Sequence, residues 1–252
     1  MKLEYFDLLS PYAIHIETVG GIVSPKIKDI FNIGKNTYQY YLFLASMDLK
    51  TFFSVTNQME LFESMNYEDK EKLNVFDLII SDDSLKKGLL SAYNFFIEED
   101  VIFDNDYNCF IVSKDDKIVG VISSKNYNIV GDIINQRNYV KFEQEEDWSK
   151  VKSQKALKIL EKIKKAKASQ RKKKQTDARM EIGNIISAVA AKSNSLNMNT
   201  IIELTVFQLW DCFTRMTSNN IYDIQSMSVA TWGDKEKTFD YNSWFNLINT
   251  DN

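Results

Sequence analysis

The first thirty-four residues combine a strand-like pattern with a helix-like one. Apolar residues alternate through AIHIETVGGIV and meet a Gly-Gly pair, which predicts a small β-hairpin over 13–24. Ser24 and Pro25 then suit the N-cap and first position of a helix, because Ser accepts an unpaired N–H and Pro lacks one. Gly34 is typical of a residue that ends such a helix.

A long apolar run follows in 36–56. Its apolar residues recur every three to four positions, which predicts the central helix of an N-terminal module. Three shorter helices are expected near 58–65, 67–80 and 82–97. In the last of these, Asp82 or Asp83 is placed to cap the first turn.

The pattern becomes strand-like after Glu98. Short β-rich runs at 101–104, 109–113 and 117–123 are separated by DNDYN and KDDK, which favour turns. They predict a three-stranded meander. A helix over 126–138 is expected next, with its inward residues at Ile129, Ile133 and Ile134.

The C-terminal part returns to helical spacing. Helices are predicted over 177–193, over 200–216 after a cap at Asn199 or Thr200, and from about Asp240 onwards. Aromatic residues mark the last two: Phe207, Trp210, Phe213, Trp244 and Phe245. These side chains either form the core of a helical module or offer a binding surface for an apolar partner.

Composition supports a helix-rich chain. The 252 residues include only 8 Gly and 2 Pro, whereas 44% are apolar. The expected class is α+β, predominantly helical. We predict three parts: an N-terminal α+β module (1–147) with the hairpin and the meander, a basic amphipathic helix and linker (148–176), and a helical C-terminal module (177–252).

The strongest electrostatic feature is the segment 149–176, SKVKSQKALKILEKIKKAKASQRKKKQT. It holds twelve of the 31 basic residues and one of the 35 acidic ones. Its first half is amphipathic, with Ala156, Ile159, Leu160 and Ile163 on one face, whereas SQRKKKQT has nothing to bury.

Three interpretations of this basic segment remain open. It contacts nucleic-acid phosphates through 149–174, it docks on an acidic protein surface, or it is a solvated helix with a polar end. Few aromatics are interleaved and the rest of the chain is acidic, which makes the nucleic-acid interpretation the weaker of the two binding ones. The candidate contact residues are Lys164, Lys165, Arg171, Lys172 and Lys173.

Candidate catalytic and metal-binding groups are few. The single histidine, His15, lies opposite the isoleucines of a short strand, and Cys109 and Cys212 are expected to be reduced packing residues. The acids around Asp104 lack the glycine that a calcium loop needs, so a hairpin turn is expected there. We expect no enzyme activity, no cofactor and no metal.

Two blocks carry a resemblance to a known family. The second is NIISAVAAKSNSLNMNTIIELTVFQLWDCFTRM (184–216), which contains LTVFQLWDCF (204–213) and is followed by the Trp-containing NSWFNLI. The early block LSPYAIHIETVGGIVSPKIKDIFNIGKNTYQYYL is of the same kind. Both are similar to tail-assembly-chaperone proteins of tailed phages of Gram-positive hosts.

The resemblance implies a function without catalytic residues. Such proteins keep the long apolar helices of the tape measure protein soluble until the tail tube polymerises around them. We therefore expect a chaperone-like tail-assembly protein of the host cytoplasm. Its expected partners are the tape measure protein or other tail components and further copies of itself, and no run is long enough to span a membrane. The alternatives are a nucleic-acid-binding protein acting through 149–174 and a structural tail or baseplate subunit.

Overall fold

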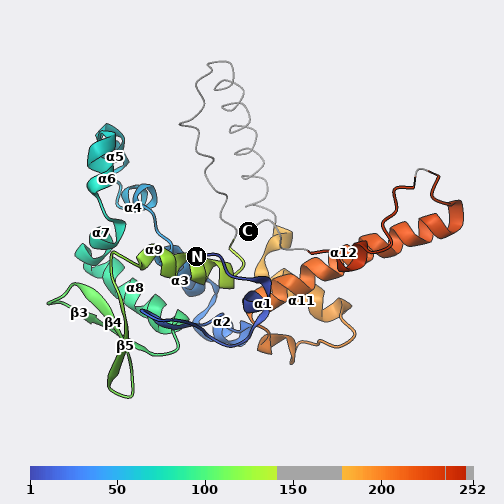
Figure 1. Cartoon of the computed structure of the whole chain (residues 1–252), viewed down its shortest axis with the longest axis horizontal. Helices are drawn as coiled ribbons and strands as arrows, with labels where there is room; N and C mark the ends of the chain where they lie inside the picture. Colours follow the sequence, from blue (N-terminus) through green and yellow to red (C-terminus); the bar gives the residue numbers. More distant parts are fainter. Residues whose placement is uncertain (141–177, 236, 248–252) are drawn as a thin grey trace. The chain divides into compact units, whose positions relative to one another are not determined.

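The computed structural model describes residues 1–140, 178–235 and 237–247 (Figure 1). By its contacts the chain divides into two compact units. Unit 1 comprises Met1–Lys141, Thr200–Asp211 and Leu247–Asn252, and unit 2 comprises Phe142–Asn199 and Cys212–Asn246. The predicted basic connector, 148–176, lies outside the described residues, so the three-part organisation stays a prediction.

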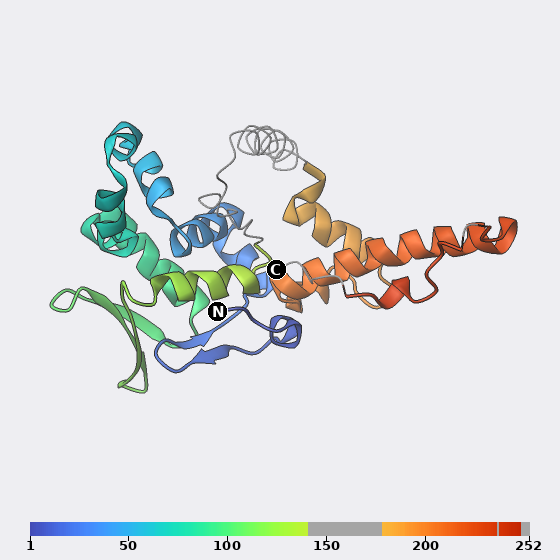
Figure 2. The same ribbon diagram turned by 45° about the horizontal axis from the view of Figure 1, so that its top comes forward.

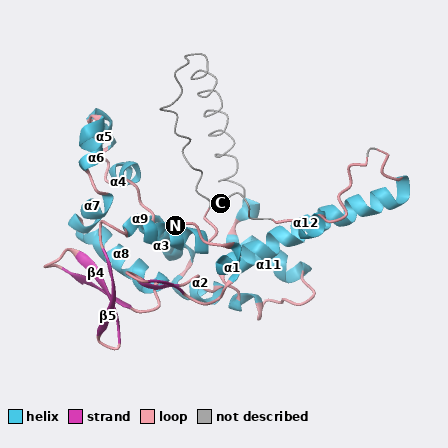
Figure 3. Cartoon of the chain, in the orientation of Figure 1, coloured by secondary structure: helices cyan, strands magenta, loops and turns pink. Residues whose placement is uncertain are grey.

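Unit 1 is mostly helical and carries two small antiparallel sheets, drawn magenta in Figure 3. Its helices are α1 (Tyr5–Leu9), α2 (Ile27–Ile33), α3 (Lys35–Ala45), α4 (Leu49–Val55), α5 (Met59–Ser64), α6 (Tyr67–Lys72), α7 (Val75–Ser81), α8 (Asp83–Phe96) and α9 (Tyr127–Arg137). Its strands are β1 (Ile14–Ile16), β2 (Gly20–Ile22), β3 (Asp100–Asp104), β4 (Cys109–Lys114) and β5 (Lys117–Ile122). The predicted class, α+β and predominantly helical, is confirmed.

Both predicted β-structures form. Strands β1 and β2 make the hairpin, with His15 exposed and opposite Gly21. Strands β3, β4 and β5 make the meander in that order, and the Asp104 carboxylate accepts the N–H of Asp106 at 2.8 Å in the first turn. The Asn94 side-chain amide donates to the Val101 carbonyl at 2.8 Å and accepts the Val101 N–H at 3.0 Å. It thereby satisfies backbone groups at the outer edge of β3.

The core of unit 1 centres on the fully buried ring of Phe110 in β4. Its centroid lies 5.0 Å from that of Tyr93 in α8 and 5.9 Å from that of Phe76 in α7, both nearly edge-on. Phe103 of β3 also meets it at 5.0 Å. Each aromatic ring buries a large apolar area, so this cluster fixes the sheet against α7 and α8.

The predicted helix over 36–56 is wrong in one respect, because it divides into α3 and α4. Asp48 starts α4 by accepting the N–H of Thr51 at 2.7 Å. The Tyr127 hydroxyl lies 2.7 Å from the carbonyl of Leu44, near the end of α3, and 3.2 Å from that of Met47, in the connection to α4. An aspartate cap and a distant tyrosine therefore override the apolar periodicity.

Other N-terminal boundaries also differ from prediction. The region 67–80 divides into α6 and α7, because Asn74 accepts the N–H of Phe76 and starts a new helix. Helix α2 has Lys26 rather than Ser24 as its N-cap, and the Ser24 hydroxyl donates instead to the carbonyl of Arg137. Of the residues expected inward on α9, Ile129 is exposed.

Arg137 holds the N-terminal segment in place. Its buried guanidinium donates to the carbonyls of Asp7, Ser10 and Tyr12 at 2.7 to 3.1 Å. Burial lowers the pKa of Arg137 to about 10, and these carbonyls replace the water that the cation has lost. The sequence offers no sign of this role, because its partners are backbone atoms more than a hundred positions away.

Unit 2 contains the turn η2 (Ala178–Met180), α11 (Ile182–Lys192), the later part of α12 (Val206–Trp232) and the turn η4 (Ser243–Phe245). Figure 2 shows α12 in orange-red, with the segment that follows it. The predicted end near 216 is wrong, since α12 continues to Trp232 and stops at Gly233, whose φ is 77°. The predicted helix from Asp240 is a single 3-10 turn. None of the helices in the described ranges has the length and apolar character needed to cross a membrane.

Candidate partner-binding surface

The predicted site residues fall into three groups. Lys164, Lys165, Arg171, Lys172 and Lys173 lie outside the described residues. Phe207 is fully buried, and Trp210 and Phe213 are half-buried. Only Trp244 and Phe245 are well exposed, at 51% and 53%. Of the candidates that the structure describes, these two are available to a partner without any rearrangement.

The segment 204–206 explains why Phe207 is buried. It pairs with 25–27 as a short antiparallel bridge: Ile27 N–H donates to Leu204 O at 3.0 Å, and Val206 N–H donates to Pro25 O at 3.1 Å. These two bonds fix 204–206 to the start of α2, and with it the neighbouring Phe207.

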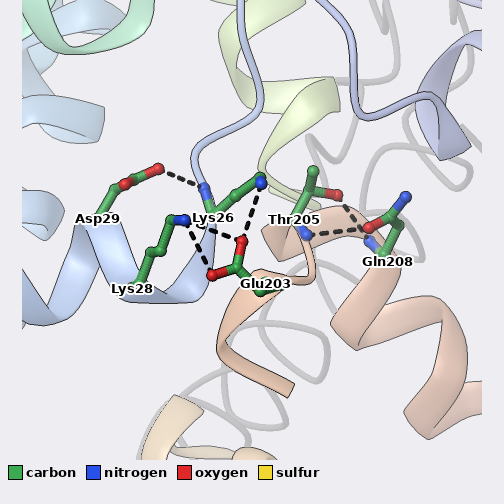
Figure 4. Close-up of polar contacts among 6 residues, drawn as sticks. All are labelled: Lys26, Lys28, Asp29, Glu203, Thr205 and Gln208. Carbon is green, nitrogen blue, oxygen red and sulfur yellow. Dashed lines mark hydrogen bonds and ion pairs between the residues drawn. The ribbon is translucent and has the colours of Figure 1, made fainter. Parts of the chain in front are cut away.

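Side chains reinforce this bridge (Figure 4). Thr205 and Gln208 cap α12 reciprocally, since the Gln208 side chain accepts the Thr205 N–H at 3.0 Å and the Thr205 hydroxyl accepts the Gln208 N–H at 3.2 Å. The Glu203 carboxylate accepts from the ammonium groups of Lys26 and Lys28 at 2.8 to 2.9 Å. We call this set the clamp: Lys26, Lys28, Glu203, Thr205 and Gln208.

The aromatic residues at the start of α12 pack inside unit 1. Tyr139 stacks on Trp210 with centroids 5.6 Å apart and planes 5° apart, and it meets Phe207 edge-on at 5.5 Å. Tyr5 donates to the Asp211 carboxylate at 2.6 Å. The motif LTVFQLWDCF therefore supplies caps, a buried ring, a stacked ring and a buried acceptor, which are packing roles.

Sequence reasoning found Trp210 and Phe207 but missed their partners. Tyr5 is about two hundred positions away from Phe207, and Tyr139 is about seventy positions away from Trp210, and both tyrosines lie in segments without a distinctive pattern. The only available signal was the helical spacing of the aromatic residues in 207–213, which indicates a packed face but not its partner.

In unit 2 the chain folds back along α12 and displays an aromatic turn. Arg215 donates to the carbonyl of Asn246 at 2.9 Å, and the ring of Phe239 lies 5.5 Å from that of Tyr222. The Asp234 carboxylate accepts the N–H groups of Thr238 and Phe239, and Asp240 accepts that of Asn242. These bonds hold the backbone of residues 237–246, which we call the returning segment.

The aromatic turn itself consists of Tyr241, Trp244 and Phe245, all exposed. The rings of Trp244 and Phe245 meet edge-on with centroids 4.9 Å apart. Such neighbouring aromatics on a surface are typical of interaction sites, because their large apolar area gains most from burial. We therefore take the aromatic turn as the candidate partner-binding surface.

Within 1–140, 178–235 and 237–247 no cluster of His, Cys, Asp and Glu side chains could hold a metal ion. Cys109 and Cys212 form no disulfide, and burial raises the pKa of the Cys109 thiol, which disfavours the reactive thiolate.

Among the comparisons with known proteins, one matches the C-terminal part of the chain. No curated protein and no solved structure matches the chain. A family model does match: residues 171–249 correspond to the YomV second domain. The match contains α11, all of α12 and the aromatic turn, and it begins close to the predicted module boundary at 177. The C-terminal part of this chain is thus similar to a phage-associated domain family.

Proposed function

We propose that the chain is a non-enzymatic tail-assembly protein of a phage, which binds apolar helices of the tape measure protein in the host cytoplasm. The observation that carries the proposal is the aromatic turn. Trp244 and Phe245 are about half exposed, adjacent and held by a bonded backbone, within the part that matches a phage-associated family.

The chemistry of this surface suits an apolar helical client. Amphipathic helices bind through apolar anchors spaced along one face, and aromatic side chains accept them with little loss of conformational freedom. Burying an aromatic side chain contributes roughly 2 kcal/mol, so two or three of them support reversible binding. Reversible binding is what a chaperone needs, because its client leaves when the tube assembles.

Co-expression with the tape measure protein tests the proposal. The full-length chain is expected to raise the soluble fraction of that protein, and the double variant Trp244→Ser, Phe245→Ser is expected to lose the effect. Tyr107→Ser is the control, because Tyr107 is an even more exposed aromatic, in the turn between β3 and β4 and outside the aromatic turn. A tape measure protein that is no more soluble with the chain than without it would contradict the proposal.

Two further measurements separate the alternative functions. A structural tail or baseplate subunit remains in purified phage particles, whereas a chaperone leaves before the tail is complete. Binding of DNA or RNA through 149–174 predicts co-purifying nucleic acid that high salt removes. The proposal expects neither outcome.

A further inference from the structure

A second surface of unit 2 lies on α12 itself, apart from the aromatic turn. Five residues follow one another at alternating spacings of four and three: Thr217, Ile221, Ile224, Ser228 and Thr231. All five are exposed, and Ile221 and Ile224 are 52% and 66% exposed. This is the spacing of a coiled-coil seam, whose side chains pack between those of a second helix. We call these five residues the α12 seam.

The returning segment does not compete for the seam. It packs on a different side of α12, where Tyr222 contacts Phe239 and the half-buried Val229 lies two turns further along the same side. Positions 222 and 229 lie roughly 100° around the helix axis from Ile221 of the seam. One side of α12 is thus used within the chain, whereas the seam faces outward.

The seam carries no charge. From Met216 to Trp232 the single charged residue is Asp223, which is not a seam position. Met227 and Trp232 flank the seam and are exposed as well. Two copies can therefore approach each other along this stripe without repulsion between like charges.

We propose that the α12 seam is the docking site for a second copy of this chain, with the two α12 helices antiparallel. In this arrangement Ile221 of each copy packs against Ile224 of the other, and Thr217 packs against Ser228. Four isoleucines surround the two-fold axis, and smaller side chains flank them. The seam is therefore complementary to itself, as a symmetric dimer requires.

The antiparallel direction follows from two physical points. Antiparallel helices place opposite ends of their dipoles together. They also place the two Trp232 side chains at opposite ends of the contact, whereas a parallel pair would crowd both at one end. The seam spans two heptads, about 20 Å, so the buried area is below the ~800 Å² per partner of a standard interface. We therefore expect a weak dimer whose population depends on protein concentration.

Sedimentation of the full-length chain over a range of concentrations tests this proposal. The wild type is expected to pass from monomer to dimer, and the variant Ile221→Lys, Ile224→Lys is expected to raise the dissociation constant at least about 100-fold. Ile118→Lys is the matched control, because Ile118 on β5 is also 66% exposed. A chain that stays monomeric, or a seam variant that dimerises like the wild type, would overturn the proposal.

Cysteine cross-linking tests the direction of the helices. In chains whose Cys109 and Cys212 are replaced by alanine, a mixture of Ile221→Cys and Ile224→Cys chains is expected to form a mixed disulfide. Either variant alone is expected to stay uncross-linked, whereas cross-linking of each with itself would establish parallel helices. The proposal does not rest on client binding, since the seam variant leaves Trp244 and Phe245 unchanged. A seam that binds only the tape measure protein would refute the dimer and leave the proposed function in place.

Discussion

The Tyr5 hydroxyl donates a 2.6 Å hydrogen bond to the Asp211 carboxylate across 206 positions of the sequence. Asp211 is nearly buried, so this bond links the N-terminal segment to the start of α12 in a partly desolvated place. Together with the clamp, it makes 200–211 an integral part of unit 1.

Removal of this hydrogen bond should destabilise the chain measurably. We expect Tyr5→Phe to lower the free energy of unfolding by about 1–2 kcal/mol, because it leaves a nearly buried carboxylate with one donor fewer. Urea denaturation followed by circular dichroism measures the loss. Tyr12→Phe is the control, because Tyr12 is 79% exposed and its hydroxyl group should contribute little. An additive double-mutant cycle between Tyr5→Phe and Asp211→Asn would show that the bond contributes nothing.

The clamp should depend on pH. The Lys28 and Lys26 ammonium groups hold the pKa of the Glu203 carboxylate below its usual range, with the hydrogen bond from Lys28 as the largest cause. A carboxylate with a lowered pKa in the folded state stabilises the fold above its unfolded pKa and loses that effect as the pH falls through the folded value.

We therefore expect Glu203→Gln to melt at a lower temperature than the wild type at neutral pH. The difference should shrink as the pH falls below about 4, where Glu begins to protonate in the unfolded chain. Added salt should also reduce it, because Glu203 and both lysines are exposed. Melting curves from pH 7 to pH 3 measure the difference, and one that stays constant across that range would exclude a role of the charge.

The packing of α9 gives a third prediction. A Cβ atom on Gly131 would collide with the carbonyl oxygen of Ala45 at the end of α3. Gly131→Ala should therefore lower the free energy of unfolding by about 2 kcal/mol. Gly183→Ala in α11 is the matched control, because nothing lies near that position and alanine favours a helix. Equal effects of the two substitutions in a denaturant titration would contradict the described packing of α9.

The local elements were largely predictable from the sequence. The two sheets, α8 and α9 follow directly from alternation, turn residues and helical spacing, and Asp82 caps α8 by accepting the N–H groups of Ser84 and Leu85. The break between α3 and α4 was not predictable, since the hydroxyl that donates to the Leu44 carbonyl there belongs to Tyr127 of another helix, α9. The extension of α12 was missed because its polar residues 217–220 weaken the apolar pattern without ending the helix.

The candidate site was predictable only in part. Trp244 and Phe245 were identified from their aromatic character, and their exposure could not be known before the returning segment was placed. Phe207 was expected either as core or as surface, and it is buried because backbone bonds hold 204–206 to 25–27. Backbone hydrogen bonds leave no trace in residue type, so this bridge has no signal in the sequence.

The basic segment gives a fourth prediction, from its composition. If the chain acts by binding proteins, the variant with Lys164, Lys165, Arg171, Lys172 and Lys173 all changed to Gln should behave like the wild type in a gel shift with DNA or RNA. Low-salt buffer makes the comparison strict, because contacts with phosphates are strongest there. A salt-sensitive shift that the variant loses would favour the nucleic-acid function instead.

The central claim is that the aromatic turn binds an apolar helix of the tape measure protein. Fluorescence anisotropy of a labelled helical peptide from that protein, titrated with the full-length chain, measures this binding directly. Trp244→Ser with Phe245→Ser should raise the dissociation constant by about 30-fold or more, which corresponds to about 2 kcal/mol, whereas Tyr107→Ser should leave it unchanged. Equal affinity of the wild type and the Trp244, Phe245 double variant would contradict the claim.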